Sequence, residues 1–159
     1  MLAKILSLGF FLLLLIGSPI KTYTKSYDTN GALTAEGWMM GTMKVKYWKF
    51  YHPNGNKAME GHFKGNKETG YWYFYNEQGG KIREGHYRAG IAQDWWIFYD
   101  LATQETRKVQ YQNNQRNGFC LVYRKGKLLK VEKYLNNTFQ SEWTDVRSFK
   151  KDNPNVSLR

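Results

Sequence analysis

Two adjacent stretches decide the fold: YWKFYHPNGNKAMEGHFKGNKETG at residues 47–70 and its near copy YWYFYNEQGGKIREGHYRAG at residues 71–90. They align at a spacing of 24 residues, so Trp48 and Trp72 occupy one column, and Trp96 continues that column one period further on. Self-similarity at a fixed period is the signature of a repeat architecture. We therefore expect a chain of stacked copies of one structural unit.

The repeat extends over most of the chain, with expected units at 24–47, 48–71, 72–95, 96–119 and 120–142 and a partial unit at 143–149. A turn glycine recurs at Gly31, Gly55 and Gly79, and a Glu-Gly pair recurs at 36–37, 60–61 and 84–85. The fifth unit is one residue shorter and carries Cys120 in the tryptophan column. Units four and five also lack the Glu-Gly pair, so their surface need not repeat that of units two and three.

Each unit reads as a β-hairpin. The run Tyr71–Tyr75 consists of good strand formers, and side chains alternate between the two faces of a strand. Turn-forming compositions such as His52-Pro-Asn-Gly55 follow each aromatic run. We predict an all-β fold: an elongated, single-layer antiparallel meander of hairpins. One face would bury the repeat core, which consists of Trp48, Phe50, Trp72, Phe74, Trp96 and Phe98, because a single hairpin is at best marginally stable alone.

The N-terminus has the layout of an export signal. A short basic start precedes the apolar run Ile5–Ile16, and Gly17-Ser18-Pro19 ends that run. We expect residues 1–22 to be a helical signal peptide or an uncleaved signal anchor, and residues 23–149 to be the repeat domain. Residues 150–159 read as a polar tail, and we expect poor order from Thr144 onward.

Composition and motifs favour binding over catalysis. The net charge of +11 attracts anionic partners, while the single cysteine cannot form an internal disulfide. No nucleophile elbow, zinc-protease helix, phosphate loop or dinucleotide fingerprint occurs. We expect no enzyme activity, no cofactor and no bound metal.

Two sets of repeated polar residues are candidates for function. The tyrosine columns carry hydroxyl tips on the face opposite the tryptophans, and basic residues recur in columns of their own. The expected binding surface comprises Tyr51, Tyr75, Tyr99, Tyr123, Lys57, Lys81, Lys64 and Arg88. Glu60 with His62, and Glu84 with His86, share a strand face, but two strands separate them, too far for one metal ion to bridge both pairs. We interpret them as a solvated polar column with cross-strand pairing.

The pattern G-x-W-x-F-Y-x-x-x-G-x-x-x-x-E-G-x-[FY]-x-x-G resembles the bacterial variant of the MORN repeat (membrane occupation and recognition nexus), over residues 24–143 and best over residues 48–95. The resemblance implies a single-layer sheet of stacked hairpins, and it implies membrane attachment, phospholipid-headgroup binding or protein scaffolding. Many bacterial variants carry an antitoxin label.

Together these observations predict an exported binding or scaffold protein of the cell envelope, located in the periplasm, at the cell surface or outside the cell. Its partner would be an anionic membrane surface or a protein, and export disfavours nucleic acid. The alternative is an antitoxin-like protein that neutralises one specific polypeptide toxin.

Overall fold

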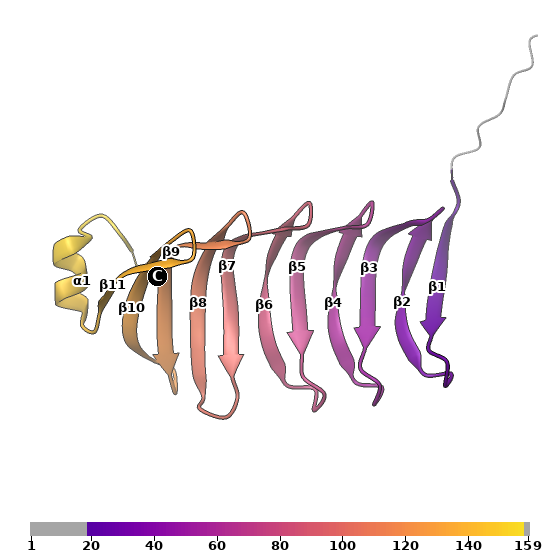
Figure 1. Cartoon of the computed structure of the whole chain (residues 1–159), viewed down its shortest axis with the longest axis horizontal. Coiled ribbons are helices and arrows are strands. Elements are labelled where there is room, and N and C mark those ends of the chain that lie inside the picture. Colours follow the sequence, from indigo (N-terminus) through magenta and orange to yellow (C-terminus); the bar gives the residue numbers. More distant parts are fainter. Residues whose placement is uncertain (1–18, 158–159) are drawn as a thin grey trace, which may run out of the picture.

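The computed structural model describes residues 19–157 as one open sheet of eleven antiparallel strands, each paired with its neighbours in sequence. The strands are β1 (Lys21–Tyr27), β2 (Leu33–Met40), β3 (Met43–Tyr51), β4 (Lys57–Lys64), β5 (Lys67–Tyr75), β6 (Lys81–Arg88), β7 (Ile91–Asp100), β8 (Glu105–Gln112), β9 (Gln115–Arg124), β10 (Lys127–Leu135) and β11 (Thr138–Trp143). A helix, α1 (Val146–Asp152), lies at the end of the ribbon (Figure 1). This confirms the predicted all-β, single-sheet meander.

The predicted N-terminal signal or anchor helix lies almost wholly outside the described residues, which begin at residue 19. Strand β1 begins at Lys21, so the last two residues of the predicted segment belong to the sheet. Among residues 19–157, no helix is long and apolar enough to cross a lipid bilayer.

The connections divide the ribbon into two long edges. Turns at 41–42, 65–66, 89–90, 113–114 and 136–137 form the short-turn edge, and those at 28–32, 52–56, 76–80, 101–104 and 125–126 form the long-turn edge. On the long-turn edge, Gly31, Gly55 and Gly79 have φ of 81°, 83° and 81°, a left-handed conformation that favours glycine. The recurring turn glycines of the sequence therefore mark one type of hairpin turn.

The tryptophan face carries a row of stacked aromatic rings. Trp48, Trp72 and Trp96 are only 2%, 1% and 3% exposed. Ring-centroid distances along the row Trp48–Phe50–Trp72–Phe74–Trp96–Phe98 run 5.9, 6.4, 6.2, 6.1 and 6.4 Å. Phe63 and Tyr87 add edge-to-face contacts from the returning strands. Because a one-layer ribbon has no second layer to pack against, its core is this row of rings from successive units.

The Glu-Gly pair of the repeat exists because each tryptophan ring lies directly over a glycine. A Cβ atom built on Gly61 would lie 2.3 Å from the nearest atom of the Trp72 ring, and Gly37 and Gly85 stand in the same relation to Trp48 and Trp96. The Trp72 indole N–H donates to the carbonyl of His62 at 3.2 Å. A bulge with two extra residues on β5 makes this close approach possible, and Gly70 takes φ of 69° within it.

Replacing Gly61 by alanine is therefore expected to lower the free energy of unfolding by about 1–3 kcal/mol, because the added methyl group overlaps the Trp72 ring. Urea unfolding followed by far-UV circular dichroism measures the loss. The same substitution made in a Trp72→Ala background should cost much less, since the ring is gone. An equal cost in both backgrounds would show that the ring is not the cause.

The contact between a glycine and a tryptophan ring has a counterpart further along the chain. In the fourth and fifth units Val109 and Cys120 occupy the glycine and tryptophan columns, face each other in register, and are 4% and 2% exposed. Valine, which is larger than glycine, is thus paired with cysteine, which is smaller than tryptophan. The two changes compensate in volume, so the row stays packed where the aromatic pattern ends.

At the short-turn edge, asparagine side chains fasten successive units together. Asn66 accepts from the backbone N–H of Lys44 at 2.7 Å and donates its own N–H to the Lys44 carbonyl at 3.1 Å. Asn114 and Asn137 do the same to Ala92 and Arg116. Gly90 occupies the equivalent position and donates its N–H to the Glu68 carbonyl, but it has no side chain to accept the Glu68 N–H.

The substitution Gly90→Asn should raise the free energy of unfolding by about 0.5–1 kcal/mol, because it adds the missing hydrogen bond and restricts the unfolded chain. A Cβ atom at Gly90 would meet nothing closer than 3.5 Å, and asparagine tolerates the φ of 83°. Thermal unfolding compares it with Gly90→Ala, which has the same backbone strain without the amide. A melting temperature no higher than that of the native chain would contradict this prediction.

Beyond the third unit the apolar packing also uses the opposite face of the sheet. Leu121, Val131 and Phe149 are 3%, 2% and 0% exposed and form a cluster with Phe119 and Trp143. Helix α1 contributes Phe149, and Asp145 caps its first turn by accepting from the Ser148 N–H at 2.8 Å. The expectation of a poorly ordered tail from Thr144 is wrong for these residues, because one buried phenylalanine docks the helix.

Candidate functional site

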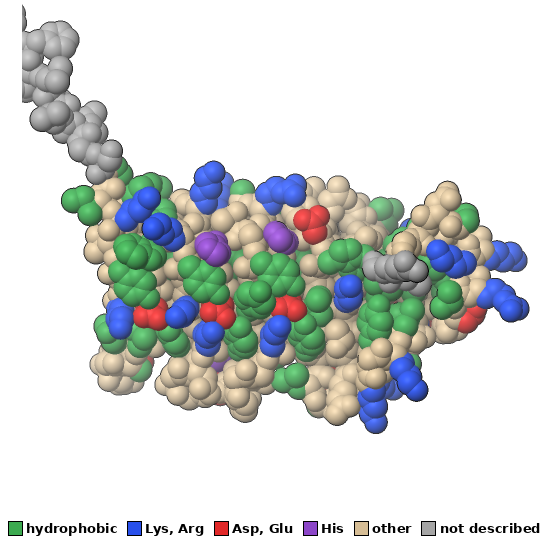
Figure 2. Space-filling model, turned by 180° about the vertical axis from the view of Figure 1, so that it is seen from behind, with side chains coloured by type: hydrophobic (Ala, Val, Ile, Leu, Met, Phe, Trp, Pro, Cys, Tyr) green, Lys and Arg blue, Asp and Glu red, His purple; other side chains and the backbone are tan. Residues whose placement is uncertain are grey.

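The face opposite the tryptophans carries a ladder of tyrosines and buried glutamates. The hydroxyls of Tyr51, Tyr75 and Tyr99 donate to Glu36, Glu60 and Glu84 at 2.7, 2.8 and 2.6 Å. Each bond joins a tyrosine to the glutamate 15 residues earlier, so it connects neighbouring units. Figure 2 shows acidic and basic side chains alternating in a row along one face of the ribbon.

Lysines complete this ladder. Lys57 and Lys81 reach Glu60 and Glu84 at 2.8 Å, and their ammonium groups lie 5.3 and 5.5 Å from the ring centroids of Tyr75 and Tyr99. Glu60 and Glu84 are only 8% and 7% exposed. The interpretation of these glutamates as solvated is therefore wrong, although they are paired across strands. A buried carboxylate needs such donors to offset its desolvation.

The ladder makes the stability of the fold depend on pH. Burial raises the pKa of Glu60, but hydrogen bonds from Lys57 and Tyr75 outweigh it, so the pKa lies below the ordinary value of 4.5. The unfolded chain then takes up the proton first as pH falls. The stabilisation by Glu60 is complete above pH 4.5 and is lost as pH falls through the lowered pKa.

Accordingly, Glu60→Gln should lower the free energy of unfolding by about 1–3 kcal/mol at pH 7, because hydrogen bonds to a charged group are lost. The difference in the free energy of unfolding between the native protein and the variant should become smaller as pH falls below 4.5. Urea unfolding at pH 7, 5 and 3.5, with Glu77→Gln on an exposed turn as control, measures this. A gap that stays constant with pH would assign the loss to something other than the carboxylate charge.

The structure places the eight predicted binding residues in three settings. Tyr51, Tyr75, Tyr99, Lys57 and Lys81 belong to the internal ladder described above. Tyr123 packs against the cluster of Leu121 and Phe149. Lys64 and Arg88 lie at the short-turn edge, away from the other six. The predicted surface is thus not one continuous patch.

The histidines of the repeat lie on the ladder face as single exposed side chains. His62 contacts the ring of Tyr47 edge-on at 4.8 Å, and His86 contacts Tyr71 at 5.5 Å. Among residues 19–157 no three histidine, cysteine or acidic side chains come close enough to share a metal ion. Their contacts are therefore those of aromatic packing partners on the sheet.

The short-turn edge combines exposed cations with exposed apolar side chains. Lys64 and Lys67 are in-register partners across the turn at 65–66, and within the described chain neither has an acidic partner. Like charges placed directly opposite on a sheet are unfavourable for folding. Met43 and Ile91, 39% and 38% exposed, flank the two neighbouring turns of the same edge.

The sequence reasoning missed Lys67, Met43 and Ile91. The available signal was their spacing: the three residues begin strands β3, β5 and β7 and lie 24 residues apart. That column carries no shared residue type, so alignment by identity does not detect it.

In comparisons with known proteins, no family model and no curated protein matches the chain.

Proposed function

We propose that the chain is a non-enzymatic binding or scaffold protein of the cell envelope, and that it attaches to an anionic membrane surface through its short-turn edge. The combination of cations and apolar tips at this edge carries the proposal. Lys64 and Lys67 bear charge that no acidic side chain of the described chain neutralises. Met43 and Ile91 expose apolar surface beside them.

This arrangement suits a lipid headgroup layer. Lysines near an anionic bilayer contribute about 1 kcal/mol each, and short apolar side chains can enter the boundary between headgroups and acyl chains. The ladder face is a weaker candidate, because its tyrosine hydroxyls and its lysines Lys57 and Lys81 already bind glutamates. The resemblance to bacterial MORN variants supports the same kind of partner.

The test is co-sedimentation of the full chain with anionic and zwitterionic vesicles across a salt series. The double variant Lys64→Ala/Lys67→Ala should bind anionic vesicles about 30-fold more weakly than the native chain, from about 2 kcal/mol for two lysines. The matched control is Lys125→Ala/Lys127→Ala, which removes the same charge from the long-turn edge. The N-terminal segment is common to all three proteins, so its own affinity for lipid cancels.

Two outcomes would overturn the membrane proposal. Equal weakening in the two double variants would show only a general attraction of positive charge. Binding by the native chain that is equally strong to zwitterionic vesicles, or that does not respond to salt, would show that the lysines do not carry it.

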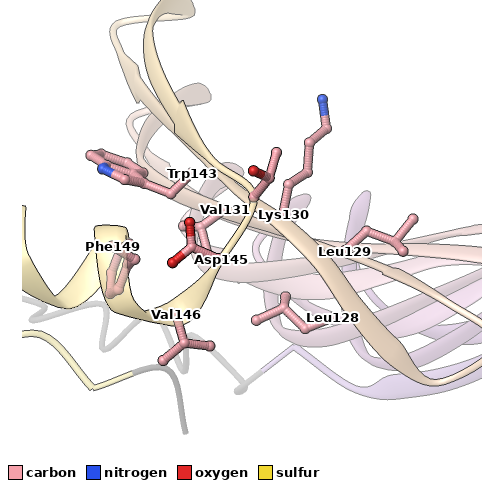
Figure 3. Close-up of a pocket in the computed structure, with 9 residues that line it drawn as sticks. Leu128, Leu129, Lys130, Val131, Trp143, Asp145, Val146 and Phe149 are labelled. Atoms are coloured by element: carbon pink, nitrogen blue, oxygen red, sulfur yellow. The ribbon is translucent and has the colours of Figure 1, made fainter.

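A second candidate is an antitoxin-like protein that binds one polypeptide toxin, and the α1 end of the ribbon favours it. Leu129 and Val146 are 40% and 57% exposed there and, together with Phe149, line a cavity of about 60 Å³ (Figure 3). Binding at such an apolar patch survives moderate salt. The substitution Val146→Asp should weaken toxin binding and leave vesicle binding unchanged, which separates the two candidates.

A further inference from the structure

A hollow on the ladder face, centred on Trp95, is lined mainly by amide side chains and an indole. It has a volume of about 340 Å³ and lies over β7, β8 and β9. Its lining consists of Gln93, Asp94, Trp95, Gln110, Tyr111, Gln112 and Asn117. In the preceding unit the columns of Gln93, Trp95, Gln110 and Gln112 carry Thr69, Tyr71, His86 and Arg88. The repeat changes here from basic and phenolic side chains to amides and an indole.

The amides of this hollow, which we call the Trp95 hollow, are held in place by hydrogen bonds. The side-chain oxygen of Gln110 accepts from the Phe119 N–H at 2.7 Å. Asn117 donates to the side-chain oxygen of Gln112 at 2.7 Å, and Gln93 donates to Asn113 at 3.0 Å. An amide has two donors and an acceptor, so each of these groups keeps hydrogen-bonding capacity for a ligand. Fixed side chains lose little entropy when they bind.

Asp94 adds a carboxylate to the rim of the hollow, and its backbone has a strained, left-handed conformation. Its φ is 62°, and the same column holds Gly70 and Gly118, for which a positive φ is easy. Residues held in such conformations cluster at functional sites. The Asp94 side chain is 64% exposed, and its nearest cation is Arg88 at 4.0 Å.

Trp95 differs from the tryptophans of the core in having a free indole N–H. Trp48, Trp72 and Trp96 donate their indole N–H to backbone carbonyls, whereas that of Trp95 has no hydrogen-bond partner within residues 19–157. The ring packs in part against the cluster of Leu121 and Phe149, the Lys108 ammonium lies 5.6 Å from its centroid, and the rest of the ring lies in the hollow. It offers a ligand an apolar surface and a donor at once.

We propose that the Trp95 hollow binds a neutral saccharide. A sugar ring has a patch of C–H groups that packs on an aromatic face, and it has hydroxyls that both donate and accept. Amides and a carboxylate match neighbouring hydroxyls, because they combine acceptors with donors. The volume lies at the lower end of the range for small-ligand sites, which accommodates one or two sugar units.

The two sources of a neutral sugar, a free monosaccharide and a unit within a polysaccharide, present the same chemistry to the hollow. The inference does not rest on membrane attachment, since Lys64 and Lys67 take no part in the hollow. If the chain did not bind vesicles, saccharide binding at the Trp95 hollow would still be expected. If no sugar bound, the prediction of vesicle binding would be unaffected.

The experiment titrates the full chain with glucose, galactose and N-acetylglucosamine, and with their β-linked and α-linked disaccharides, by ligand-observed NMR. We expect millimolar binding of at least one sugar. A disaccharide that binds at least tenfold more tightly than its monosaccharide indicates a polymer as the source, and equal affinities indicate the free sugar. No binding by any sugar of the panel would overturn the proposal.

The decisive variant is Asp94→Gly, which removes the carboxylate and relieves the strained backbone. It should bind the sugar at least tenfold more weakly while melting at no lower temperature than the native chain. Lys46→Gly is the matched control, because Lys46 occupies the same column with φ of 57° and lies outside the hollow. It should leave sugar binding unchanged. Binding that is equal in the native chain and in Asp94→Gly would overturn the assignment.

Discussion

Replacing Trp72 by alanine is expected to lower the free energy of unfolding by about 3–5 kcal/mol. The Trp72 side chain is 1% exposed and lies in the middle of the aromatic row. It stacks on Phe50 and Phe74 at 6.4 and 6.2 Å and receives the edge of Phe63 at 5.0 Å. Within residues 19–157 no second layer covers this face, so nothing there would fill the space that alanine leaves.

Urea unfolding followed by far-UV circular dichroism measures this loss. The matched control is Trp38→Ala, because Trp38 is only half-buried and lies on the ladder face, where its main ring contact is Tyr23 at 5.4 Å. The free energy of unfolding should fall in Trp38→Ala by less than half of the loss in Trp72→Ala. In a repeat array each unit is stabilised by its neighbours, so the Trp72 variant should also unfold less cooperatively. Equal losses in the two variants would refute the central role of the row.

The substitution Phe149→Ala is expected to release α1 from the sheet. Phe149 is 0% exposed and packs against Phe119 and Trp143 at 5.5 and 5.3 Å. Truncating a buried phenylalanine costs about 3–5 kcal/mol, and a seven-residue helix has no stability of its own to offset this. The helix should therefore unfold locally while β1 to β9 stay intact.

Hydrogen exchange of the backbone amides in residues 146–152 is the direct measurement. Their protection should fall to that of an unfolded peptide in Phe149→Ala and stay near native in the control Lys151→Ala, whose side chain is exposed. Release of α1 also exposes Leu121 and Val131, and exposed apolar patches associate. Size-exclusion chromatography should then show more self-association. Unchanged protection in Phe149→Ala would contradict the docking role of this ring.

Much of the fold was predictable because its dominant interactions are local and repeated. The 24-residue column of Trp48, Trp72 and Trp96, together with alternation along Tyr71–Tyr75, determines the hairpins, their order and the face that is buried. Each strand pairs with its neighbour in sequence, so no long-range choice of topology had to be made. A strict period leaves one way to stack the units.

Three features were decided only by tertiary structure, because each depends on a contact between units. Glu60 reads as a surface residue until the hydroxyl of Tyr75, a strand away, is seen to bury it. Gly61 recurs in the sequence without an evident role until the ring of Trp72 is found over it. The C-terminal segment is predicted to be unstructured, because a single apolar residue, Phe149, does not by itself indicate in the sequence that a helix docks on the sheet. Periodicity in the sequence therefore determined the ribbon, whereas the burial of individual side chains depended on which neighbours the bulged strands bring within contact distance.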